Sequence, residues 1–166
     1  SGDERVLYSM DKPLAHIHLD QTLQVAKWCV DAGLRTSCFF IVAYPGGYLH
    51  KKYSRNKEEI LAKYGSHILE SSGDQLFMRG EDQESYEETL RFCQKLIDIG
   101  VEAITPLIAT PYPGTDLYSA CQKYGWLAFE DDPNVLTTVS YAAMRPEFIQ
   151  IETPWCTREE AYERWR

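Results

Sequence analysis

The sequence lacks the features that would place it in a membrane or on nucleic acid. No apolar run approaches the ~20 residues that a membrane-spanning helix needs, and no signal peptide opens the chain. Lys and Arg are outnumbered by Asp and Glu, 17 to 25, which gives a formal net charge of −8. Because phosphate backbones are bound by clustered basic side chains, this balance argues against a nucleic-acid surface. We therefore expect a cytoplasmic protein with neither a membrane nor a nucleic-acid partner.

The cysteines are too few and too scattered to build a metal cluster or a disulfide framework. No two of the five lie closer than nine positions: Cys29, Cys38, Cys93, Cys121 and Cys156. A cluster loop needs thiolates within a few residues of one another, so we expect no metal-ligating set in this chain. An odd number of scattered thiols fits a reducing compartment, and we expect buried, free cysteines.

Two segments of the chain follow the same pattern and predict a pair of parallel strands. One apolar run ends in Pro45-Gly46, and a second ends in Pro113-Gly114. Mostly apolar runs of this length are typical of strands buried on both faces, as in parallel α/β sheets. We expect strands over about 35–43 and 102–109. Both Pro-Gly turns should lie at the same end, since right-handed crossovers return each strand in the same direction.

Helical patterns surround the predicted strands. Apolar residues at spacings of three and four predict a helix over residues 20–32 that ends at Gly33, and a second from the Asp82 cap to about Ile99. The inward face of this second helix is predicted to hold Tyr86, Leu90 or Thr89, Cys93, and Leu96 or Ile97. Three shorter helices are expected: residues 3–9, residues 115–124, and a C-terminal one that begins at the capping box of Thr157 and Glu160.

The two turns resemble those of a known enzyme family. FFIVAYPG at residues 39–46, and the run GEDQESYEETLRFCQKLIDIGVEAITPLIATPYPGTDLY at residues 80–118, resemble the C-terminal half of the radical S-adenosylmethionine (radical SAM) barrel. The subgroup that often carries a cobalamin-binding domain is the most similar. In that pattern one strand runs into Gly-x-Pro-Gly-Glu, and the next ends in Thr-Pro-Tyr-Pro-Gly-Thr. The opening Ser1-Gly2 resembles the exit of the strand before them.

The resemblance implies a fold and a domain plan. We expect an α/β protein that is a partial (β/α) barrel fragment, with parallel strands, outer helices and a helical insertion. Residues 1–125 would form the later half of the barrel, interrupted at 47–80, and residues 126–166 a C-terminal extension packed on it. The N-terminal half, with its Cys-x-x-x-Cys-x-x-Cys loop, would be the missing partner of this chain, which by itself is expected to be inactive.

Residues 47–80 are the part that departs from the family pattern. They hold a helical pattern with a capping box of Asn56 and Glu59. Its apolar stripe is narrow and consists of Ile60 or Leu61, Tyr64 and Ile68. A stripe of that width is too narrow for a core of its own, so we expect it to rest on the barrel rim or on sequence outside this chain. A lid over the site and a decorative or partner-binding segment are both open.

The resemblance also implies cofactors and site residues. A 4Fe–4S cluster in the full-length protein would reduce S-adenosylmethionine to methionine and a 5′-deoxyadenosyl radical, and cobalamin is left open. The reaction on a small-molecule substrate would be methyl transfer or ring formation. The C-terminal half would supply the adenosine-side wall, and the residues carried over by position are Ser1, Ile41, Ala43, Tyr44, Leu107 and Ile108. Ala43 stands where the family usually has glycine.

Simpler interpretations stand beside these hypotheses. The apolar site candidates fit an ordinary strand core equally well. His16 and His18 have the spacing of two zinc ligands but fit exposed loop residues better, since no third ligand is near in sequence. The acidic residues that follow Gly80 suit the start of a helix better than acid–base catalysis. A non-catalytic α/β module that binds a ligand or a partner is the alternative to an enzyme fragment.

Overall fold

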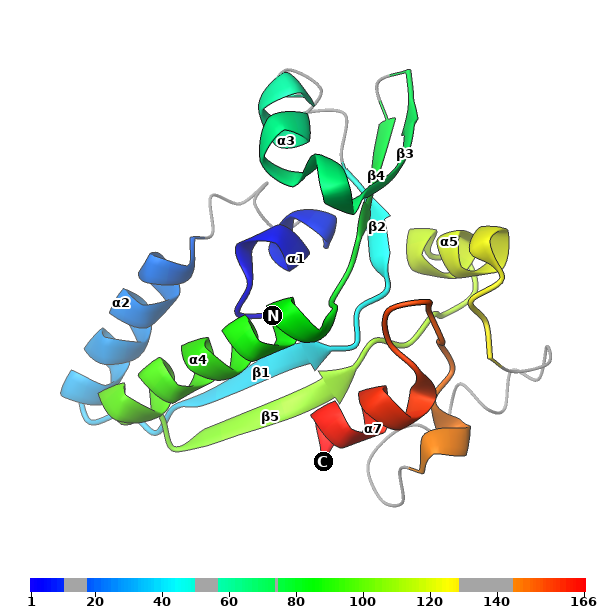
Figure 1. The fold of residues 1–166 in the computed structure, drawn as a ribbon. Coiled ribbons are helices and arrows are strands. Elements are labelled where there is room, and N and C mark those ends of the chain that lie inside the picture. Colours follow the sequence, from blue (N-terminus) through cyan, green and yellow to red (C-terminus); the bar gives the residue numbers. More distant parts are fainter. Residues whose placement is uncertain (11–17, 50–56, 74, 129–144) are drawn as a thin grey trace.

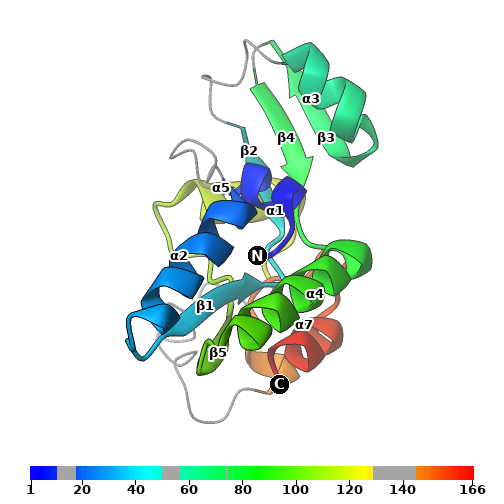
Figure 2. The ribbon, with the colours of Figure 1, turned by 90° about the vertical axis from the view of Figure 1, so that its left-hand side faces the viewer.

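The protein is an α/β structure whose two sheets differ in kind (Figures 1 and 2). A computed structural model describes residues 1–10, 18–49, 57–73, 75–128 and 145–166. One sheet pairs two parallel strands, and the other joins three antiparallel strands in the order β2-β4-β3. The α/β fold class and the parallel pair predicted from the sequence are thereby confirmed, and no closed barrel forms among the described residues.

The parallel sheet consists of β1 (Ser37–Val42) and β5 (Ala103–Ile108), which pair in register from the first residue of each to the last. Helix α4 (Gln83–Ile99) is the crossover between them, capped by Asp82 and closed by Gly100 in a left-handed conformation. Figure 1 shows both strand arrows pointing the same way, toward β2 and α5. The two Pro-Gly turns therefore follow the same end of the sheet, as predicted.

One face of this sheet is covered by helices. Helix α2 (Leu19–Asp31) packs against α4, and both lie on the face formed by Cys38, Phe40 and Ile104. The core under these helices is apolar and consists of Ala26, Phe40, Phe92, Leu96 and Val101. Burial of this face removes apolar surface from water, at about 25 cal/mol per Å², and that is the main force that holds the helices on the strands.

The opposite face of the sheet is open along its first half. Side chains alternate across a strand, so Phe39, Ile41 and Leu107 point away from α2 and α4. Phe39 is 67% exposed. Towards the strand ends this face becomes covered, because Ile41 packs against a cluster that includes Phe77 and Trp126. The sheet thus has one face closed by helices and one face closed only near its carboxyl end.

The insertion forms the antiparallel sheet together with one helix. Its elements are β2 (Gly46–Tyr48), α3 (Lys57–Tyr64), the 3-10 turn η3 (Gly65–His67), β3 (Ile68–Ser72) and β4 (Gln75–Arg79). The sequence predicted α3 but missed the hairpin of β3 and β4. The expectation that the apolar stripe could not form a core of its own is wrong, because its residues pack on Leu49, Leu76 and Met78 within the insertion. Tyr8 of α1 joins the same cluster.

The remaining helices lie beyond the carboxyl ends of the parallel strands or along the sheet. They are α1 (Glu4–Ser9), α5 (Asp116–Tyr124), the 3-10 turn η4 (Pro146–Phe148) and α7 (Arg158–Trp165). Helix α7 packs on both parallel strands, and the capping box of Thr157 and Glu160 is present at its start. No helix in the described ranges combines the length and the apolar character needed to cross a membrane.

Candidate functional site

Five of the six predicted site residues gather at the carboxyl ends of the parallel strands. Ile41 pairs in register with Leu107, and Val42 pairs with Ile108. Ala43 and Tyr44 follow directly as the chain leaves β1. This is the end of a parallel α/β sheet at which such proteins bind their ligands.

These residues divide between the two faces of the sheet. Ile41 and Leu107 point to the partly open face, and Tyr44 joins the aromatic cluster that closes it. Ala43 and Ile108 instead pack on the side of α7, in a cluster with Ile149, Cys156 and Ala161. On the partly open face Ile41 and Leu107 lie side by side, and Ile41 also packs against the cluster of Phe77 and Trp126. The side chains of Ala43 and Ile108 belong to the packing of α7.

Ser1 lies apart from this group, beside α4. Its hydroxyl oxygen is 3.3 Å from that of Thr89 and accepts a hydrogen bond from the Asp3 amide. The next residue is locked in place as well, since a Cβ on Gly2 would come within 2.6 Å of the Phe92 Cβ. The start of the chain is thus fixed against the helix that leads from β1 to β5.

Ala43 has an unusual backbone. Its φ of 54° makes it the one non-glycine residue with a positive φ among those described. A left-handed conformation costs an L-residue with a Cβ about 1–2 kcal/mol, and glycine avoids that cost. The radical SAM pattern has glycine at this position, and the backbone conformation of Ala43 would favour glycine there on steric grounds.

The two ends of the insertion meet at this same turn. The Gly80 amide donates to the Pro45 carbonyl at 3.1 Å, and the Glu81 amide donates to the Tyr44 carbonyl at 2.7 Å. The approach is so close that a Cβ on Gly80 would lie 1.9 Å from the Tyr44 oxygen. The chain thus leaves the turn after Pro45 and returns to it at Glu81, 36 positions later.

Glu81 is the most deeply buried acidic residue at this turn, with 0% of its surface exposed. Its Oε1 accepts a hydrogen bond from the Ala43 amide at 2.8 Å and lies 3.5 Å from Nη1 of Arg164 in α7. Burial raises the pKa of Glu81, and the bond from Ala43 and the charge of Arg164 only partly offset that effect. The sequence analysis missed both residues. The Gly-Glu pair at 80–81 was the available signal, but no local pattern pointed to Arg164.

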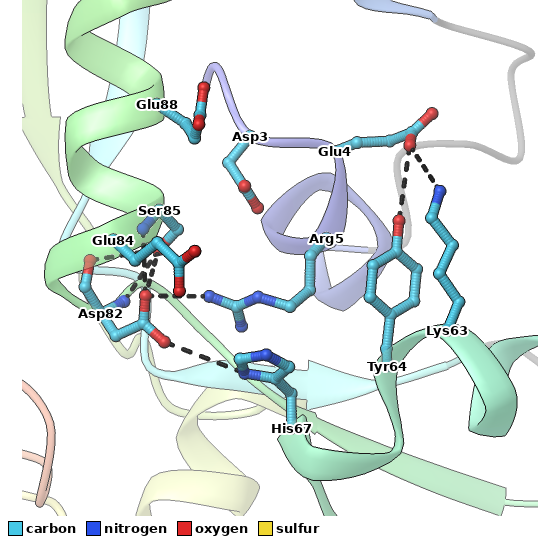
Figure 3. A pocket seen from close by; sticks show the side chains of 10 residues that line it. All are labelled: Asp3, Glu4, Arg5, Lys63, Tyr64, His67, Asp82, Glu84, Ser85 and Glu88. Atoms are coloured by element: carbon cyan, nitrogen blue, oxygen red, sulfur yellow. Dashed lines mark hydrogen bonds and ion pairs between the residues drawn. The ribbon is translucent and has the colours of Figure 1, made fainter.

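A polar pocket of about 370 Å³ lies between α1, the start of α4 and the helical part of the insertion. Figure 3 shows its lining side chains, which come from Asp3 to Arg5, from Lys63 to His67 and from Asp82 to Glu88. Carboxylates outnumber cationic groups on its walls. Glu4 is paired with Lys63 at 3.0 Å, and Arg5 with Asp82 at 3.2 Å, so the principal charges already have partners within the protein.

Arg5 and Asp82 tie the floor of this pocket together. The Arg5 guanidinium donates to the carbonyls of Arg79 and Gly80 at 2.7 and 2.8 Å, at the point where the insertion ends. Burial alone would raise the pKa of Asp82, but hydrogen bonds from Ser85 and the charge of Arg5 outweigh it and hold that pKa below its ordinary value. For His67 burial lowers the pKa, and the nearby arginines add to the effect. The network is a structural clamp between α1, β4 and α4.

The cysteines and histidines offer no metal centre in the part of the chain that is described. All five thiols are free, and burial raises the pKa of Cys121 and of Cys156 to about 12. His18 caps α2 at the surface, and His16 lies outside the described residues. Within the described ranges no three His, Cys, Asp or Glu side chains are placed to hold a metal ion.

Comparisons of the chain with protein-family models, with curated proteins and with solved structures found no match.

Proposed function

We propose that this chain forms the later half of a radical SAM-type barrel and supplies the adenosine-side wall of an S-adenosylmethionine site. The observation that carries the proposal is the exit of β1. There the left-handed Ala43 occupies the family's glycine position, and Pro45-Gly46 follows it. A resemblance in sequence and a backbone conformation that calls for glycine thus coincide at one residue.

The position of Glu81 gives further support. In the family pattern a glutamate follows Pro-Gly directly, whereas here Gly47 stands in that place. The insertion returns Glu81 to the same turn, where its amide bonds to Tyr44 and its carboxylate to Ala43. The segment 47–80 therefore stands between the Pro-Gly and the Glu of that pattern, and its two ends meet at one turn.

The residues present suit the apolar part of such a ligand. Ile41 and Leu107 offer adjacent apolar side chains on the partly open face, which suit the apolar surface of an adenine ring. The iron–sulfur cluster would supply the electron that cleaves S-adenosylmethionine and would be bound by sequence outside this chain. This chain's own part is to orient the adenosine and to exclude water from it.

The free edge of β1 fits a missing half of the barrel. Among the described residues β1 pairs only with β5, so no described strand occupies its other edge. Beside that edge lies an apolar groove of about 380 Å³, lined in part by Val25, Ala26 and Cys38. A further parallel strand along β1, with its own helix in the groove, would continue the barrel.

The test uses the whole encoded protein, reconstituted anaerobically with iron and sulfide and supplied with S-adenosylmethionine and a reductant. We expect a cluster and the formation of 5′-deoxyadenosine. Ile41→Arg and Leu107→Arg should keep the cluster but lose most of the cleavage, because a charged side chain would enter the adenosine wall. Leu90→Arg, on the exposed side of α4, is the matched control and should cleave normally.

Two results would contradict the proposal: a reconstituted protein without a cluster, or normal cleavage by both wall variants. The 166-residue chain alone should retain no stoichiometric iron, since its cysteines have no chelating spacing. A protein without a cluster would favour the alternative, a non-catalytic module that binds a ligand or partner through the insertion. The polar pocket beside Lys63 and His67 is the observation behind that alternative.

A further inference from the structure

We propose that Arg164 and Glu81 form a buried positioning pair through which the C-terminal helix α7 holds the left-handed exit of β1. The pair joins residues 83 positions apart in the chain. The pair holds the backbone at Ala43 whether or not a ligand is bound. The further statement that it thereby shapes an adenosine-side wall rests on the function proposed above.

The first step is that Glu81 forms hydrogen bonds to the turn at the exit of β1. Its carboxylate accepts the Ala43 amide at 2.8 Å, while its own amide donates to the Tyr44 carbonyl at 2.7 Å. One residue therefore bonds to both residues of the exit, with its side chain and with its main chain. Because the left-handed conformation of Ala43 is unfavourable by itself, some interaction must compensate for it. A hydrogen bond to a buried carboxylate is strong enough to do so.

The second step is the link from Glu81 to α7. Arg164 is 6% exposed, and its guanidinium lies over the Tyr86 ring, 5.1 Å from the centroid. The Tyr86 hydroxyl donates to the Arg164 carbonyl at 3.5 Å. Ala161, one turn earlier in α7, packs in the same cluster as the Ala43 side chain. Helix α7 therefore contacts Ala43 in two ways. Ala161 packs near the Ala43 methyl group, and Arg164 pairs with the Glu81 carboxylate that accepts the Ala43 amide.

The third step concerns what the pair is for. Oε2 of Glu81 and Nη2 of Arg164 are both buried, and neither has a hydrogen-bond partner within the described structure. A buried ion pair joined at one point, with a donor and an acceptor left over, is a poor source of stability, since apolar residues of the same volume often do as well. Such a pair does fix which groups face each other. Its role is therefore to set a geometry, here the position of α7 against the exit of β1.

The experiment measures amide hydrogen exchange of the full 166-residue chain, residue by residue, by NMR. Arg164→Met should speed exchange at Ala43 by about tenfold or more, a factor that corresponds to the loss of a buried charged partner. Arg158→Met is the matched control, because Arg158 lies on the same helix and pairs with Glu152 near the surface at 3.4 Å. It should leave Ala43 unchanged.

Variants of Glu81 separate the carboxylate's two roles. Glu81→Gln keeps an oxygen for the Ala43 amide and loses the charge, so Ala43 should exchange more slowly in it than in Glu81→Leu. In the Glu81→Gln background Arg164→Met should add little, because the charge that couples the two is already gone. Full additivity of the two substitutions would overturn the coupling.

Global unfolding is the competing explanation and is measured in parallel with urea. If exchange at Ala43 rises only as much as at the slowest core amides, the pair is structural and not a positioning device. Should Arg164→Met not fold, Arg164→Lys is used, which keeps a cation but loses the planar stacking geometry. Unchanged exchange at Ala43 in either folded variant contradicts the proposal. Neither readout needs S-adenosylmethionine, so failure here is distinct from failure of the proposed function.

Discussion

The parallel unit and the antiparallel unit of this protein bury their apolar side chains in different ways. The parallel unit, made of α2, β1, α4 and β5, buries one face of its sheet under long helices and leaves part of the other face open. The antiparallel unit, residues 46–79, buries a small cluster of its own under one short helix. Part of the second face of the parallel sheet stays exposed, as Phe39 shows. The antiparallel sheet buries both faces of its central strand, because Leu76 and Met78 lie in the insertion's own cluster while Phe77 packs against Trp126.

The largest effect is expected from truncating the core of each unit in turn. Leu96 is fully buried between α4 and the parallel strands, so Leu96→Ala should cost about 2–5 kcal/mol of the free energy of unfolding. Ile60→Ala should instead loosen the antiparallel unit locally, because among the described residues its cluster takes only Tyr8 from outside residues 46–79. Urea unfolding and amide exchange measure both. Equal loss of protection throughout the chain in Ile60→Ala would show one cooperative unit and break the comparison.

A medium effect is expected at the exit that joins the units. Ala109 and Ala43 are similarly buried, at 7% and 8% exposure, but only Ala43 has a positive φ. Ala109→Gly should cost about 1–2 kcal/mol, from the lost methyl burial and the greater freedom of the unfolded chain. In Ala43→Gly the relief of about 1–2 kcal/mol of backbone strain should cancel that cost. Identical destabilisation of the two variants, measured by urea unfolding, would mean that Ala43 is not strained.

The smallest effect is expected from the surface link between the insertion and α5. Lys123 donates to the Tyr48 hydroxyl at 2.8 Å and pairs with Glu70 of β3. The link is exposed, so Lys123→Met should leave the unfolding midpoint nearly unchanged and speed amide exchange in β3 only. Lys95→Met, on the surface of α4, is the control. A change in exchange at β1 or β5 would mean that α5 transmits the link into the parallel unit.

The sequence predicted the parallel unit well because its signals are local. Pro-Gly turns, glycine helix ends and capping residues all lie within a few positions of the feature that they mark. Which residues of α4 face the core was harder to predict from the sequence. Thr89 is buried because its hydroxyl accepts the Gly2 amide, and Phe92 is buried as well, whereas Leu90 and Ile97 are about half exposed. Hydrophobicity alone could not choose between these neighbours.

The hairpin of the antiparallel unit was missed because hydrophobic and polar residues do not alternate along its central strand, β4. Phe77 of β4 packs into the aromatic cluster on one side, while Leu76 and Met78 pack into the insertion's own cluster on the other. Three adjacent apolar residues therefore carry no period of two. At the candidate site, Ala43 and Tyr44 were named from the family resemblance, and their role at a ligand stays a prediction. Arg164 could not be named, because its partner is distant in sequence and joined only by the fold.

The closure at Gly46 and Gly80 bears on how this chain can change over time. The insertion begins and ends at one place, where a Cβ on Gly80 would lie only 2.5 Å from the Gly46 nitrogen. A chain without the residues between these glycines could reconnect its backbone over that short distance, at the loss of Phe77 from the aromatic cluster that closes the sheet. The insertion can therefore vary in length while its two ends stay together at this turn. Such a change would leave the residues on either side, Ala43 and Glu81, bonded to each other.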